Sequence, residues 1–151
     1  MKVLIVLVAV FLIATGIARI FSGSWHVVLS GNIAMCMMLC FTASGHFAFS
    51  KGMAMMIPSF IPFKKALVFW TGLLEIAAGI ALLFPASRYA AGIFLILFFI
   101  CILPANIHAA LHHLDYQKGS YDGKGVRYLW FRIPMQLFLI AWVGYFSIYL
   151  P

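Results

Sequence analysis

The chain has 151 residues, of which 66% are hydrophobic and only 9% are charged. A soluble domain carries about 25% charged residues, so this composition excludes an ordinary soluble domain and indicates an integral membrane protein. The ten basic residues outnumber the three acidic ones, but they are spread thinly, so nucleic-acid binding is not expected and a one-sided excess of positive charge at a membrane explains them better.

Five apolar stretches reach, or nearly reach, the length of about 20 residues that a helix needs to cross a bilayer. Only helices or closed barrels span membranes, and these stretches are too long and too uniformly apolar for barrel strands. The sequence therefore predicts an all-α transmembrane helical bundle. The stretches are residues 3–21, 27–48, 66–84, 89–107 and 128–149.

The first stretch follows Lys2 and contains small residues near its end. These features also fit a signal peptide, but Arg19 and Phe21 sit poorly beside a cleavage site, so a retained transmembrane helix is favoured. We expect residues 1–25 to form an N-terminal helix and residues 26–151 to form a four-helix membrane domain.

The basic residues lie mostly on one side of this five-helix arrangement. Such a bias marks the cytoplasmic side of a membrane protein. It predicts that the N-terminus and the segments 49–65 and 108–127 are cytoplasmic and that the C-terminus is outside. On the inner side are Lys2, Lys51, Lys64, Lys65, Lys118, Lys124 and Arg127, and on the outer side are Arg19 and Arg88.

The segment 49–65 is too apolar for an ordinary solvated loop, and Pro58 and Pro62 exclude one straight helix. We expect it to lie at the inner membrane interface, with Lys64 and Lys65 at the surface. The alternative is that the methionines of this segment line a flexible entrance for a ligand.

Glu75 is the one acidic residue inside an apolar stretch. A carboxylate at mid-bilayer costs roughly 2.5–3.5 kcal/mol on insertion scales, so Glu75 is expected to avoid lipid. Gly72 and Gly79 share its helix face and would let a neighbouring helix come close. Gln136 in the last stretch matches the depth of Glu75, and Arg132 lies nearer the cytoplasm with a side chain long enough to reach inward. These two residues are therefore the expected partners of Glu75.

Polar residues of two other stretches approach the same half of the membrane. We therefore predict one buried polar cluster of His46, Glu75, Asn106, Arg132 and Gln136. Two interpretations stay open. The cluster either fixes the helix register, with Glu75 paired to Arg132, or it binds a polar head group or relays protons.

The histidines indicate a metal or haem only weakly. His108 and His112 have the i, i+4 spacing that can hold a metal on a helix, but no third ligand converges on them. A haem would need axial histidines that face each other, such as His46 and His108, and is disfavoured. No metal site is predicted, and packing is the expected role of Cys36, Cys40 and Cys101.

Several motifs in a fixed order resemble those of the DoxX-like family of small membrane proteins. The resemblance covers residues 40–145, includes all five residues of the predicted cluster, and implies a four-helix core to which this chain adds an N-terminal helix. The motifs are GHF (45–47), an IPxxIP-like spacing (57–62) in a Met/Pro-rich stretch, TGxxEIxxGIxLL (71–83), LPANIHAAL (103–111) and WFRIPMQLFLIAW (130–142).

The resemblance implies a protein of the bacterial cytoplasmic membrane, and it leaves enzymatic activity and oligomeric state open. The family takes its name from a subunit associated with a quinol-oxidising complex, and related proteins act as assembly helpers. One expected function is a redox-associated subunit that binds a quinone-like or other lipophilic molecule at the Glu/Arg/His cluster, with the redox centre in a partner protein. The alternative is a non-enzymatic assembly factor or lipid-binding protein whose polar cluster is structural.

Overall fold

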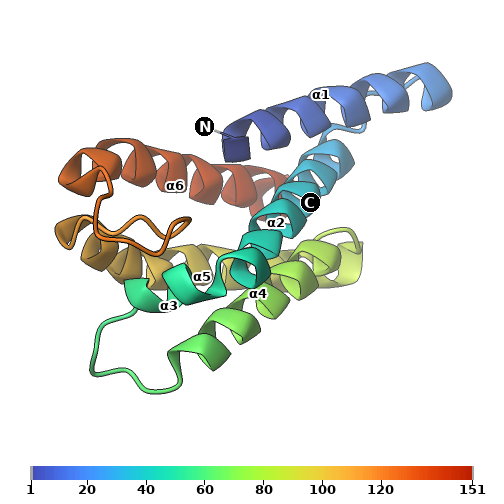
Figure 1. Cartoon of the computed structure of the whole chain (residues 1–151). Helices are drawn as coiled ribbons and strands as arrows, with labels where there is room; N and C mark the ends of the chain where they lie inside the picture. Colours follow the sequence, from blue (N-terminus) through green and yellow to red (C-terminus); the bar gives the residue numbers. More distant parts are fainter. Residues whose placement is uncertain (1, 151) are drawn as a thin grey trace.

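The computed structural model describes residues 2–150, and within this range the chain is helical, with no β-strand. The all-α prediction is therefore confirmed. In chain order the elements are α1 (Lys2–Ser22), α2 (Val27–Ala48), α3 (Ser50–Met56), α4 (Lys64–Ala81), α5 (Pro85–Leu111), a 3-10 turn η1 (Gly125–Tyr128), α6 (Leu129–Val143) and a π-helical end η2 (Gly144–Tyr149) (Figure 1).

Four helical segments are long and apolar enough to cross a membrane, namely α1, α2, α5 and the continuous helix Gly125–Tyr149. They coincide with four of the five predicted stretches, which makes the chain an integral membrane protein of the all-helical class. The fifth stretch forms α4. Its 18 residues include Lys64, Lys65 and Glu75, so length and composition alone do not mark it as a span.

The N-terminal helix α1 packs along α2 and against the end of the chain (Figure 1). Leu7 is fully buried on the packed face, and the ring of Phe11 lies 5.1 Å from that of Trp142. Ile5 and Leu12 are exposed on the opposite face. An exposed aliphatic face of this kind suits contact with lipid.

The core lies between α2, α4, α5 and α6. Met35 and Leu39 from α2 meet Leu82 beyond α4, Leu95 from α5 and Val143 from α6, and all five side chains are almost completely buried. Apolar packing of this density holds the helices in one register.

The face of α4 that carries Gly72, Glu75 and Gly79 receives a neighbouring helix, as predicted, but that helix is α2. A Cβ atom added at Gly79 would lie 3.4 Å from the Cα of Cys36, and one added at Gly72 would lie 2.8 Å from the Cβ of His46. The two small residues let the antiparallel helices approach at two levels, one on each side of Glu75.

The connections at one end of the bundle are compact. The segment 49–65 forms the short helix α3 and then an irregular stretch, consistent with its two prolines. Gly52 of α3 lies directly against the backbone carbonyl of Tyr116, so α3 packs on the loop between α5 and η1. We call this end of the bundle the lysine-rich end, because it carries Lys51, Lys64, Lys65, Lys118, Lys124 and Arg127.

Candidate functional site: a buried histidine–glutamate pair

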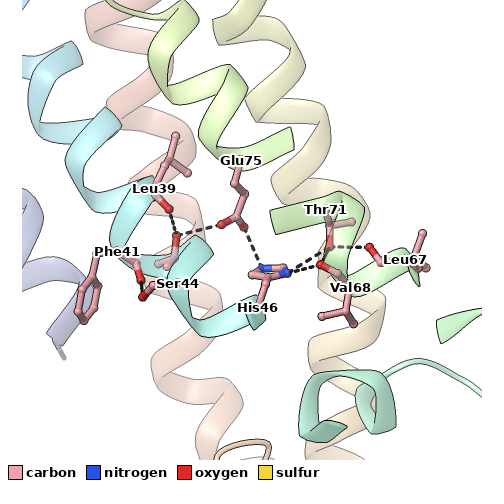
Figure 2. A network of polar contacts seen from close by, with 9 residues as sticks. Leu39, Phe41, Ser44, His46, Leu67, Val68, Thr71 and Glu75 are labelled. Atoms are coloured by element: carbon pink, nitrogen blue, oxygen red, sulfur yellow. Dashed lines mark hydrogen bonds and ion pairs between the residues drawn. The ribbon is translucent and has the colours of Figure 1, made fainter. Parts of the chain in front are cut away.

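Glu75 is buried between α4 and α2, with only 6% of its side chain exposed (Figure 2). Its Oε1 atom lies 3.4 Å from Nε2 of His46, and its Oε2 atom accepts a hydrogen bond from the hydroxyl of Thr42 at 3.0 Å. Thr42 and His46 are one helical turn apart, so both point from α2 toward the carboxyl group. The carboxyl group thus has polar partners on a single neighbouring helix.

The contacts of the Nδ1 atom, on the other side of the His46 ring, indicate which ring nitrogen carries a hydrogen. The Nδ1 atom lies 2.9 Å from the backbone carbonyl of Val68 and 3.2 Å from the hydroxyl of Thr71 (Figure 2). Because a carbonyl can only accept, Nδ1 carries a hydrogen. A proton on either Nε2 of His46 or Oε1 of Glu75 would then let these two atoms attract each other, and the pair would be neutral overall. A neutral pair avoids the cost of an isolated charge in the interior.

The contact between the two residues is loose. An ordinary N–H···O hydrogen bond spans about 2.7–3.2 Å, and the distance between Nε2 and Oε1 is 3.4 Å. The side chain of His46 is also 15% exposed, more than that of Glu75. A polar group arriving from outside the bundle would therefore meet the edge of the histidine first.

Exposed aromatic side chains flank this edge. Phe47 follows His46 in α2, and Phe69 follows Val68 in α4; their rings meet edge to face with centroids 5.6 Å apart. Trp70 continues the group, with its ring 5.9 Å from that of Phe69. All three side chains are exposed, so a flat apolar ring could pack on them beside His46.

Arg132 lies away from Glu75, and the predicted ion pair between them is wrong. The described residues 2–150 contain no ion pair between the two. Burial raises the pKa of the Tyr116 phenol, and the positive charge of Arg132 lowers it in part, so Arg132 lies near enough to this loop residue to affect its pKa. The physical reason is that α4 packs on α2, α3 and α5, while α6 packs mainly on α5.

Gln136 and Asn106 are buried, but within residues 2–150 neither makes a hydrogen bond to His46 or Glu75. The side-chain amide of Gln136 donates to the carbonyl of Phe99, across the contact between α6 and α5. Its Oε1 atom and the Nδ2 atom of Asn106 have no hydrogen-bond partner within residues 2–150. The structure thus joins only His46 and Glu75 of the five residues predicted to cluster.

Two residues of the site, Thr42 and Thr71, were not predicted. Each lies four residues before an ionisable residue on the same helix, Thr42 before His46 and Thr71 before Glu75. That spacing places a hydroxyl on the same helix face, so it is the signal that would have found them.

A second buried polar network, also unpredicted, joins α2 to η2. The side-chain amide of Asn32 donates to the carbonyls of Val28 at 2.8 Å and Phe146 at 3.0 Å, and its oxygen accepts from the Ser147 hydroxyl at 2.7 Å. Because both side chains are engaged, this network needs no ligand to complete it.

No group of three potential metal-binding side chains occurs in the part of the chain that the structure describes. The rings of His108 and His112 lie with their centroids 4.2 Å apart and their planes tilted by 33°. Both nitrogens of His46 face protein groups, so neither is directed at a position that an iron could occupy.

The apolar helices and the paired ionisable residues between α2 and α4 define a helical-bundle integral membrane protein with a buried histidine–glutamate pair. A family model described as "Domain of unknown function (DUF8561)" matches residues 35–147. Because this match covers most of the chain, the protein belongs to that family. The matched region includes His46 and Glu75 and leaves α1 outside. Neither a curated protein nor a solved structure matches the chain.

Proposed function

We propose that this protein is a DoxX-like membrane protein that binds a quinone-like or similar lipophilic molecule at the pair formed by His46 and Glu75. The observation that carries the proposal is the contact between His46 and Glu75, which is longer than an ordinary hydrogen bond. Nε2 and Oε1 lie 3.4 Å apart, so the two atoms could share one exchangeable proton, and 15% of the histidine side chain is exposed. A head group with a carbonyl or hydroxyl oxygen would compete with Oε1 of Glu75 for a hydrogen on Nε2 of His46.

The surroundings of His46 support a ligand with a flat ring. Offset or edge-to-face aromatic contacts are worth about 0.5–1.5 kcal/mol beyond the burial of area, and the exposed rings of Phe47 and Phe69 supply them. Thr42 and Val68 hold the carboxyl group and the imidazole in place from the two helices. Preorganised partners of this kind reduce the entropy cost of binding.

The pair handles protons and not electrons. In the proposed role the redox centre therefore belongs to a partner protein, and His46 and Glu75 exchange protons with the bound head group. We further propose the bacterial cytoplasmic membrane as the location, with the lysine-rich end on the inner side, because Lys and Arg concentrate on the cytoplasmic side of membrane proteins.

The test is the thermal midpoint of the purified protein with and without a short-tailed benzoquinone or naphthoquinone. We expect the quinone to raise the midpoint of the wild type. Glu75→Gln keeps the shape but removes the exchangeable proton, and His46→Gln removes the ring. A hydrogen bond to a charged group is worth about 1.5–3 kcal/mol, so either variant should weaken quinone binding roughly 10- to 100-fold.

Ser147→Ala is the control, because it removes one buried hydroxyl from the Asn32 network and leaves the pair untouched. It should bind quinone as the wild type does. A wild type that no quinone stabilises, or a Glu75→Gln protein with unchanged affinity, contradicts the proposal. Two results together favour the structural interpretation of the pair. They are that Glu75→Gln unfolds and that quinone does not change the thermal midpoint of the wild type.

A further inference from the structure

A hollow of about 780 Å³ opens at the lysine-rich end, between α3, the start of α4 and the end of α5. Its charged and polar lining is cationic or neutral, and no acidic side chain of the described residues belongs to it. We call it the lysine groove, after the residues Lys51, Lys64, Lys65, His108, His112 and Tyr121 that line it.

The lysine groove retains several hydrogen-bond donors. The ammonium group of Lys64 donates to the carbonyl of Ile57 at 2.8 Å and has two further hydrogens. The first turn of α4 also faces the groove, and no side chain caps its free N–H groups, which favour an anion. The Nδ1 atom of His108 is buried and has no partner within residues 2–150.

The remaining lining is apolar and includes Met55, Ile57 and Phe63. Phe63 is 84% exposed, and its backbone has a positive φ of 54° just before α4. For a residue other than glycine this conformation costs about 1–3 kcal/mol, and such residues concentrate at functional segments. Phe63 is the exposed member of this apolar lining, while Ile57 is buried and Met55 is half-buried. Cationic donors beside an apolar lining suit an amphiphile with an anionic head group better than a free anion.

We propose that the lysine groove binds the head group of an anionic phospholipid from the surrounding bilayer. The phosphate would lie against Lys51, Lys65 and the start of α4, and the first apolar part of the lipid would lie along Met55 and Ile57. The groove lies where apolar helices end in lysines, the level at which phospholipid head groups occur. The inference is independent of the function proposed for His46 and Glu75.

The test measures lipid binding to the full chain in neutral detergent, by the thermal midpoint and by lipid retained in native mass spectrometry. The probes are short-chain phosphatidylglycerol, short-chain phosphatidylcholine and inorganic phosphate. Lys51→Gln/Lys65→Gln is the variant, because neither side chain makes a hydrogen bond or ion pair within residues 2–150. Lys118→Gln/Lys124→Gln removes the same charge outside the groove and serves as the control.

Phosphatidylglycerol should stabilise the wild type and the control, while phosphatidylcholine and inorganic phosphate should not. At about 1 kcal/mol per lysine, the groove variant should bind phosphatidylglycerol about thirtyfold more weakly. An unchanged groove variant, or a control weakened as much, overturns the proposal. An equal rise in the thermal midpoint with inorganic phosphate would show a free-anion site and overturn the proposal. An equal rise with phosphatidylcholine would overturn it as well.

Discussion

Replacing Gly72 with alanine should destabilise the protein and separate α2 from α4 at the level of the His46–Glu75 pair. The added Cβ would lie 2.8 Å from the Cβ of His46, an atom that cannot move without the α2 backbone. Overpacking of this kind costs about 1–3 kcal/mol. The helices must therefore shift, which lengthens the contact between His46 and Glu75. The free energy of unfolding in mixed micelles measures the effect.

Gly16→Ala is the matched control for this substitution. It lies inside α1, where an added Cβ would have no atom within 4 Å, and alanine is favoured over glycine in a helix by about 0.5–1 kcal/mol. Gly16→Ala should therefore stabilise the protein slightly, and Gly72→Ala should destabilise it. Gly79→Ala, whose nearest contact would be 3.4 Å, should fall between them. Equal effects at Gly16 and Gly72 would contradict the close packing of α2 on α4.

Asn32→Ala should be the most damaging truncation outside the pair. Asn32 is 1% exposed, and it binds the carbonyl of Phe146 and the hydroxyl of Ser147. Its loss leaves both groups without this partner in the interior. An unsatisfied buried polar group costs about 1–3 kcal/mol, so the loss of stability should be about 2–4 kcal/mol. The thermal midpoint and the denaturant midpoint both report it.

Ser147→Ala separates the two contributions. It removes only the hydroxyl that donates to Asn32 and leaves the bond from Asn32 to the Phe146 carbonyl. We expect it to cost about 1 kcal/mol, as one ordinary hydrogen bond does. If Asn32→Ala costs no more than Ser147→Ala, the bond to Phe146 does not hold η2 against α2.

The helices could be predicted because the signals that define them are local. Four predicted stretches coincide with helices long and apolar enough to span a membrane. Their ends shifted where polar residues interrupt the apolar run: α5 continues to Leu111, through Pro104 and past Asn106, because helical hydrogen bonding does not require an apolar side chain. Pro85 opens α5 four residues before the predicted start, since proline suits the first turn of a helix.

The site could be predicted only in part. The small residues around Glu75 correctly indicated a closely packed neighbouring helix, and His46 was correctly included among the polar residues near it. Arg132 was chosen as the partner from its approximate depth, its charge and the length of its side chain. Depth places a residue along the bundle axis, but it carries no information about which helices are adjacent.

The sequence by itself determined the class of protein, the helical segments and the presence of a carboxyl group that must face protein. Each of these follows from the transfer of side chains and backbone from water to an apolar medium, which depends on composition and spacing. Only the tertiary structure decided that Glu75 meets His46 and Thr42, and that it forms no ion pair with Arg132 within residues 2–150. The choice of neighbour depends on how the helix surfaces fit, and here Gly72 and Gly79 fit α2.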